Sequence, residues 1–269
     1  KANYPVDKLG AIQTPFYFYD LNVLRATLNE INQHKGSFKV HYAMKANVNT
    51  SVLQVIKEAG LGADCVSGGE VQAALDAGIP ASEVVFAGVG KADWEINLGL
   101  DNDIFCFNVE SAVELEIINE LAAAKNKVAS IALRINPEVD AHTHAKITTG
   151  MKENKFGINL SQLGGVLDKL KEMKHVKLIG IHSHIGSQIT DMSSFRNLVI
   201  RFNEIQEELE AHGVTVENLN FGGGLGIDYY HPNHLSIPAF DNYFAAIHKL
   251  LQVRPGQQVH FEPGRSIVA

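Results

Sequence analysis

Lys45 is the first residue in the chain whose surroundings suggest chemistry. It follows a short apolar, β-rich run at residues 40–44 and precedes Ala46 and Asn47. A lysine that leaves a strand among apolar residues is partly desolvated, which lowers its pKa and frees the amine for Schiff-base chemistry. The alternative is an ordinary surface lysine that starts a loop, and this residue alone does not separate the two.

Three glycines and a later arginine are suited to binding a phosphate. Gly222, Gly223 and Gly224 follow a strand-like run, and glycines let backbone N–H groups approach a phosphate closely. A glycine run alone is more often a simple turn. Residues 262–265, however, follow the next strand-like run and bring Arg265 to the same corner. Glycines and an arginine together predict a phosphate site.

Two histidines stand two residues apart in a strand-like run. Alternation along a strand places His182 and His184 on one face and Ser183 on the other. No third ligand of matching spacing accompanies them, so no metal site is expected. We interpret one histidine as structural and the other as lying flat against a ring, with Ser187 as a donor to a phosphate oxygen.

Arg134 lies inside an apolar run, and a buried arginine requires an anionic partner. Asp64, at the end of a predicted strand, and Glu70 are structural candidates, and a ligand in the site is the alternative. Glu70 also fits a helix cap, because it stands three residues after Ser67.

The elements that must position these residues alternate between short β-branched runs and longer amphipathic ones, which is typical of a parallel α/β fold. A helix is expected over 21–31, and another over 110–124 with Val113, Ile117, Ile118 and Leu121 on one face. The aromatic segment 16–19 is also β-rich. Eight strands are expected, at residues 40–44, 63–66, 84–87, 104–107, 130–136, 178–184, 218–221 and 258–261. Eight strands with seven intervening helices predict a TIM-type barrel, whose active site lies at the carboxyl ends of the strands.

Composition excludes several classes of protein. The 269 residues carry a net charge of -7 and no basic run, which argues against a nucleic-acid or membrane-surface partner. No apolar stretch reaches the roughly 18 residues of a membrane span. Cys65 and Cys106 form no disulfide or zinc pattern, which fits the cytoplasm.

At this point the motifs resemble those of the fold-type III decarboxylases that depend on pyridoxal 5'-phosphate (PLP). They stand in order at predicted strand exits, and the resemblance covers about residues 14–269. The motifs are Tyr42-Ala-Met-Lys-Ala-Asn47, His182-Ser-His-Ile-Gly-Ser-Gln188, Gly222-Gly-Gly-Leu-Gly226 and Glu262-Pro-Gly-Arg265.

Within that group the chain is most similar to the diaminopimelate decarboxylases. This closer resemblance is carried by Phe107-Asn-Val-Glu-Ser111, Arg134-Ile-Asn-Pro137, Thr143-His-Ala-Lys-Ile147, Lys155-Phe-Gly157 and Leu225-Gly-Ile-Asp-Tyr229. It implies a barrel of the alanine racemase-like type and PLP-dependent conversion of meso-diaminopimelate to L-lysine and CO₂.

The resemblance also assigns roles. Lys45 would bind PLP as a Schiff base, His184 would stack on the pyridine ring, and Glu262 would keep the ring nitrogen protonated; these three are the expected catalytic residues. Arg265 would also lie near the substrate. The expected cofactor shell is Lys45, Asp64, His184, Ser187, Gly222, Gly223, Gly224, Glu262, Pro263, Gly264 and Arg265.

The resemblance further implies a homodimer and a C-terminal β domain beyond Ala269. Residues 1–20 would be an arm and strand that pair with that domain, and 21–269 the PLP-binding barrel. The chain is then expected to hold most of the cofactor shell without the complete catalytic site.

Three other functions remain open at this stage. The first is a decarboxylase of ornithine or arginine, and the second is a single-domain PLP-binding protein without turnover. The third is a Schiff-base aldolase, which would use a lysine and phosphate glycines but would not need a glutamate directed at a ring nitrogen.

Overall fold

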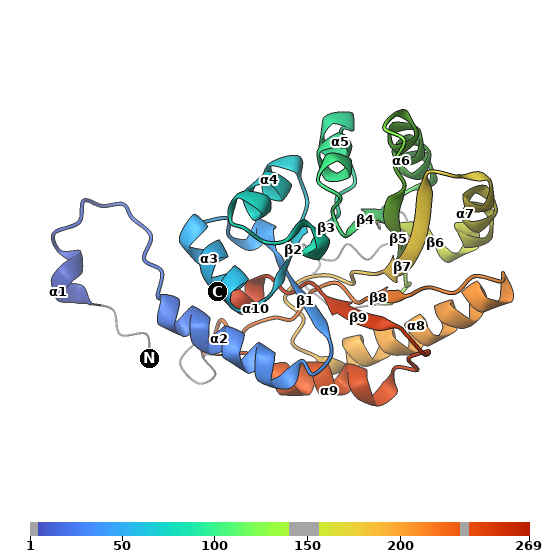
Figure 1. Ribbon diagram of the computed structural model, residues 1–269. Helices are drawn as coiled ribbons and strands as arrows, with labels where there is room; N and C mark the ends of the chain where they lie inside the picture. Colours follow the sequence, from blue (N-terminus) through green and yellow to red (C-terminus); the bar gives the residue numbers. More distant parts are fainter. Residues whose placement is uncertain (1–4, 140–155, 232–236) are drawn as a thin grey trace.

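The computed structural model describes residues 5–139, 156–231 and 237–269, and its centre is a closed ring of parallel strands (Figure 1). Following the chain, each barrel strand pairs with the next, and β9 pairs back to β1. The predicted TIM barrel is therefore confirmed, with strand boundaries within about two residues of those expected. The ring consists of β1 (Lys39–Ala43), β2 (Gly62–Cys65), β3 (Val84–Phe86), β4 (Cys106–Val109), β5 (Ala129–Asn136), β7 (Val176–His182), β8 (Asn218–Asn220) and β9 (Gln258–Phe261).

Helices surround the ring and connect its consecutive strands (Figure 1). Two short helices, α1 (Val6–Leu9) and α10 (Arg265–Val268), lie near the ends, and α2 (Leu21–His34) packs beside α9. The seven connecting helices are α3 (Thr50–Glu58), α4 (Gly68–Asp76), α5 (Asp93–Asp101), α6 (Ala112–Ala124), α7 (Leu160–Glu172), α8 (Met192–Ala211) and α9 (Phe240–Leu250).

Of two predictions about these helices, one is confirmed and the other is partly wrong. Ser67 caps α4 as predicted, since its hydroxyl accepts a hydrogen bond from the Glu70 N–H at 3.2 Å. The face predicted for α6 was partly wrong, because Val113 is exposed. Ile118 faces the core as expected, and Leu115, three residues earlier on the same side of the helix, does so in place of Val113.

The barrel interior contains several polar side chains, whereas the interior of a TIM barrel is usually filled by Val, Ile and Leu. Asn108 on β4 reaches Glu262 at the end of β9, and these strands are not neighbours in the ring, so both side chains cross the interior. His41 on β1 bonds to His260 on the neighbouring β9 at 2.9 Å. Buried polar groups need such partners, and a polar barrel interior indicates a function beyond packing.

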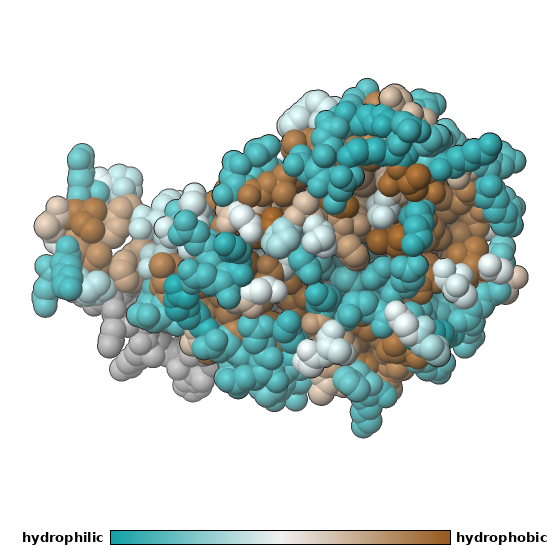
Figure 2. Space-filling model, in the orientation of Figure 1, coloured by the Kyte–Doolittle hydropathy of each residue, from teal (hydrophilic) through white to brown (hydrophobic). Residues whose placement is uncertain are grey.

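Two segments differ from the expected elements. Residues 16–19 form no strand, because a strand needs a hydrogen-bonded neighbour and none of the described residues pairs with this segment. The side chain of Tyr17 is 88% exposed. This N-terminal part projects from the barrel (Figure 2). Conversely, the short β6 (Ile158–Asn159) was not predicted; it pairs with the end of β5 outside the ring.

Both cysteines are free and buried. Across residues 5–139, 156–231 and 237–269, none of the helices combines the length and the apolar character needed to cross a membrane.

Candidate active site

A cavity of ≈430 Å³ opens at the carboxyl ends of β1, β7, β8 and β9, where a TIM barrel carries its active site. Seven of the predicted site residues line it: Lys45, His184, Ser187, Gly224, Glu262, Gly264 and Arg265. Four others lie next to these without lining the cavity: Asp64, Gly222, Gly223 and Pro263. The structure thus brings together residues that are more than 200 positions apart in the chain.

Lys45 lies in the short turn η1 (Met44–Ala46) that ends β1, and its amine points toward Asp64 on the neighbouring β2. The distance between Lys45 Nζ and Asp64 Oδ2 is 3.4 Å. The negative charge of Asp64 raises the pKa of Lys45 by more than desolvation lowers it. The expectation of a lowered pKa was therefore wrong, because the sequence did not show that a carboxylate faces this amine.

Asp64 is buried, and its Oδ1 atom has no hydrogen-bond partner among the described residues. Burial raises the pKa of this carboxyl to about 7, and repulsion from Glu262 acts in the same direction against the attraction of Lys45. An unpartnered polar atom inside a protein is costly, so its retention beside the cavity suggests a role in binding or proton transfer.

This pKa gives a testable pH dependence. The folded chain binds a proton at Asp64 between the ordinary pKa of 3.8 and about 7, while the unfolded chain does not, so the wild type loses stability as pH rises through this window. Asp64→Asn does not titrate there. We expect the melting temperature of the variant minus that of the wild type, both without PLP, to rise between pH 4 and 7 and then to level off. A difference that stays constant with pH would contradict the raised pKa.

His184 lines the cavity with a neutral ring. Its Nδ1 accepts a hydrogen bond from the Gly223 N–H at 3.3 Å, so the proton is assigned to Nε2. Burial lowers the pKa of His184 to about 3, and the nearby charges of Arg134 and Lys45 act in the same direction. A neutral, fixed imidazole is suited to lie against the face of an aromatic ring.

The glycine loop is shaped first by its own backbone packing. A Cβ on Gly223 would lie well under 3.0 Å from the carbonyl oxygen of Glu262, and Gly222 has a φ of +63°, which favours glycine. The N–H of Gly222 donates to Asn220 Oδ1 at 2.9 Å, and that of Gly223 donates to His184. Within this loop, Gly224 is the glycine that lines the cavity.

The crowding around Gly223 and the open space around Gly165 predict opposite effects of an alanine substitution on the free energy of unfolding. Gly223→Ala should lower the free energy of unfolding by about 1–3 kcal/mol, the usual cost of overpacking. Gly165→Ala, in the interior of α7 with nothing within 4 Å of the added methyl group, should raise it by about 0.5–1 kcal/mol. Urea unfolding of both variants measures this difference. Equal effects of the same sign would show that the loop has room for a side chain.

Arg265 begins α10 and is exposed beside the cavity, where its Nη1 donates to the Tyr229 hydroxyl. Its guanidinium carbon lies 5.9 Å from the centroid of the Tyr229 ring. Because this cation has no carboxylate partner among the described residues, it is suited to bind an anionic ligand.

The anionic partner expected for Arg134 is a structural carboxylate, but it is neither of the two candidates named from the sequence. Arg134 Nη1 bonds to Glu110 Oε1 at 2.5 Å, rather than to Asp64 or Glu70. Glu110 directly follows β4, which pairs with β5, so the two side chains meet across neighbouring strands. Strand order in the closed ring would have indicated this carboxylate.

The side chains that hold Glu262 were not predicted from the sequence. They are Asn108 on β4, Asn220 on β8 and His182 on β7. Asn108 is a polar residue in an otherwise apolar strand, which was the available signal. The arrangement of the three side chains around one carboxylate depends on the ring closing.

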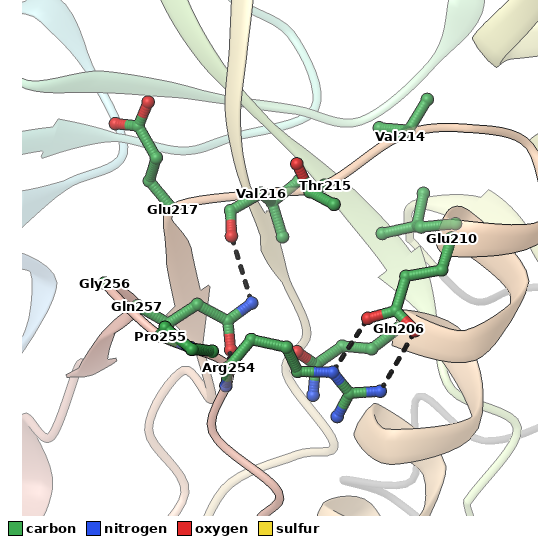
Figure 3. A pocket seen from close by; sticks show the side chains of 11 residues that line it. Gln206, Glu210, Val214, Thr215, Val216, Glu217, Arg254, Pro255, Gly256 and Gln257 are labelled. Atoms are coloured by element: carbon green, nitrogen blue, oxygen red, sulfur yellow. Dashed lines mark hydrogen bonds and ion pairs between the residues drawn. The ribbon is translucent and has the colours of Figure 1, made fainter.

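A second cavity, of ≈420 Å³, lies at the opposite end of the barrel, next to the loops that enter β8 and β9 (Figure 3). Its charged groups are already paired: Arg254 Nε and Nη2 donate to the two carboxylate oxygens of Glu210, at 2.8 and 3.4 Å. Gln257 Nε2 donates to the Val216 carbonyl at 3.0 Å. These contacts stabilise the amino-terminal end of the barrel, the end that in TIM barrels contributes to stability and not to catalysis.

Comparison with known proteins agrees with this geometry. A family model for the pyridoxal-binding domain of pyridoxal-dependent decarboxylases matches residues 21–269. The chain is 60% identical to a diaminopimelate decarboxylase of Bacteroides thetaiotaomicron, covering 100% of this chain and 70% of the relative. It is 38% identical to a diaminopimelate decarboxylase of Aquifex aeolicus, covering 95% and 60%.

The fold is also similar to that of a solved relative. The crystal structure of diaminopimelate decarboxylase from Helicobacter pylori complexed with L-lysine matches with a TM-score of 0.90 and 36% identity, covering 98% of this chain and 66% of that one. The chain thus spans between 60% and 70% of the length of these proteins.

Proposed function

This chain belongs to the diaminopimelate decarboxylases, a family of pyridoxal-dependent enzymes, and we propose that it provides the PLP site for the decarboxylation of meso-diaminopimelate to L-lysine and CO₂. The observation that carries the proposal is the single cavity into which β1 brings the Lys45 amine and β9 brings the Glu262 carboxylate. A Schiff-base aldolase needs the first group but not the second.

The groups around the cavity fit PLP in chemistry and in size. A volume of ≈430 Å³ falls in the usual range for small-molecule sites. Lys45 offers an amine for the aldehyde, and Glu262 a buried carboxylate for a ring N–H. His184 offers a neutral ring face, and Arg265 with Ser187 a cation and a hydroxyl for the phosphate. We therefore propose these residues, together with Asp64 and the glycine loop, as the cofactor shell.

Bound PLP supplies an electron sink that stabilises negative charge on the substrate carbon as the carboxylate leaves. The residues of the chain prepare for this chemistry. Lys45 must lose its proton before its amine can react, and Asp64 Oδ2, 3.4 Å away, is a base within reach. With a pKa of about 7, Asp64 can accept this proton at neutral pH and return it.

Arg265 supports a second part of the proposal, recognition of a substrate carboxylate. Its guanidinium lies at the cavity mouth and is held by a neutral hydroxyl, so it can form a bidentate pair with an incoming carboxylate. Diaminopimelate carries two carboxylates, whereas ornithine and arginine carry one.

The activity is tested by measuring CO₂ release and the amino-acid product from meso-diaminopimelate, L-ornithine and L-arginine. The assay uses the complete gene product that contains this chain, loaded with PLP. We expect L-lysine from the first substrate and little release from the other two. Faster release from ornithine or arginine would replace the proposed substrate, and PLP binding without release from any of the three would favour a non-catalytic carrier.

We also propose that the complete protein is a cytoplasmic homodimer with a small amino acid as its substrate. The resemblance to the family and the free cysteines support this assignment. Light scattering on the purified protein tests the dimer, and cell fractionation tests the location.

A further inference from the structure

Glu262 is held in the barrel by three side chains from three strands. It is buried, and its Oε1 accepts hydrogen bonds from Asn220 Nδ2 at 2.6 Å and from Asn108 Nδ2 at 3.2 Å. Its Oε2 is bonded to His182 Nε2 at 2.9 Å. The carboxylate therefore cannot turn without breaking several hydrogen bonds at once.

The occupied positions indicate which oxygen is left for a ligand. A carboxylate has about four acceptor positions, two on each oxygen. Asn108 and Asn220 fill both positions on Oε1, while His182 fills one on Oε2. Glu262 lines the cavity, so the remaining acceptor position belongs to the oxygen that His182 holds.

His182 directs its Nε2 at Glu262. Since an ionised carboxylate only accepts, a ring proton is assigned to Nε2. The other ring nitrogen, Nδ1, is buried without a hydrogen-bond partner among the described residues. A purely structural histidine would be expected to satisfy both nitrogens, so retaining this unpartnered atom favours a function for the Nε2 donor.

The charges around Glu262 favour its ionised form, which can accept a ring proton. Burial alone raises the pKa of Glu262, but His182, followed by Lys45 and His41, lowers it by more. Glu262 therefore stays ionised inside the barrel, where an uncompensated carboxylate would take up a proton.

We propose that His182 is a positioning residue for the cofactor: it fixes Glu262 Oε2 so that this oxygen accepts the proton-bearing nitrogen of the pyridine ring. The inference rests on the proposed PLP site and adds a role for a residue outside the cavity lining. The two histidines of β7 and its exit then have separate tasks, because His184 lies at the cavity and His182 lies behind Glu262.

Two amide substitutions separate the role of the Nε2 donor from general damage. The amide nitrogen of His182→Gln occupies nearly the position of Nε2 and can still donate to Glu262. The amide nitrogen of His182→Asn lies near the position of Nδ1 and cannot reach Glu262. Ser183→Ala is the control for the strand itself, because Ser183 is buried and donates to the Ile135 carbonyl at 2.7 Å, away from Glu262.

The measurement is the ¹⁵N resonance of the ring nitrogen in holoprotein loaded with ¹⁵N-labelled PLP, together with kcat. We expect a protonated nitrogen in the wild type, in His182→Gln and in Ser183→Ala. In His182→Asn we expect an unprotonated nitrogen and a kcat lower by about 10- to 100-fold, as for outer partners of metal ligands. KM should change little.

Two results would overturn the inference. One is a protonated ring nitrogen in His182→Asn together with a kcat equal to that of the Ser183→Ala control. The other is a decrease of kcat in His182→Gln as large as that in His182→Asn. Failure of the wild type to take up PLP on Lys45 would instead overturn the proposed function itself. If His182→Asn does not fold, an unprotonated ring nitrogen in folded His182→Gln is sufficient to contradict the inference.

Discussion

Lys45→Ala is expected to fold and to form no covalent adduct with PLP. Lys45 is half-exposed at the end of β1, so its removal leaves the core intact, and none of the other described residues that line the cavity carries an amine side chain. We expect decarboxylation to fall by on the order of 10⁴-fold. Loss of a positioned proton-transfer group alone costs about 10²- to 10⁴-fold, and this variant also loses the covalent attachment.

Lys39→Ala is the matched control for this prediction. Lys39 lies at the opposite end of the same strand and bonds to Glu83 at 3.0 Å on the surface. Its removal should leave the absorbance of the bound cofactor and the turnover nearly unchanged. Equal losses in the two variants would show that the effect comes from strand damage rather than from the amine of Lys45.

Glu262→Gln is expected to bind PLP and to lose most of its turnover. The amide is nearly isosteric with the carboxylate but carries no charge, so it cannot keep a ring nitrogen protonated. Removing a preorganised electrostatic partner commonly costs on the order of 10²- to 10³-fold in kcat. Because Lys45 and Arg265 are untouched, the affinity for PLP should fall much less than kcat.

Glu217→Gln provides the comparison for Glu262→Gln. Glu217 is an exposed carboxylate just before β8 that pairs with Lys177 at 3.2 Å, and such surface pairs contribute little. The kcat of the Glu217→Gln enzyme should match that of the wild type. A Glu262→Gln enzyme with unchanged kcat would remove Glu262 from the catalytic group.

The barrel was predictable from the sequence because its strands are short apolar runs separated by amphipathic helices. Lys45, His184 and Glu262 could be placed at one end of the barrel for the same reason, since each stands at or directly after the end of a predicted strand. The two-residue β6 has no periodicity to detect. The segment 16–19 has the composition of a strand, but composition cannot supply a hydrogen-bonded neighbour.

The contacts between strands were the part that the sequence did not show. The partner of Arg134 and the carboxylate facing Lys45 depend on which strands are adjacent and on the register between them. Asp64 meets Lys45 because Ala43 and Asp64 are paired in the ladder of β1 and β2. At its own strand exit alone, Lys45 is expected to have a lowered pKa, whereas the facing Asp64 raises it.

The most direct test is to locate the PLP attachment site. Borohydride reduction of the holoprotein followed by peptide mass spectrometry should place the adduct on Lys45. Lys91 is the informative alternative, because it also follows a barrel strand, but its amine is buried and donates to the Gly88 and Asn108 carbonyls and to Glu114. An adduct on Lys91, or on any lysine other than Lys45, would contradict the assignment of the site.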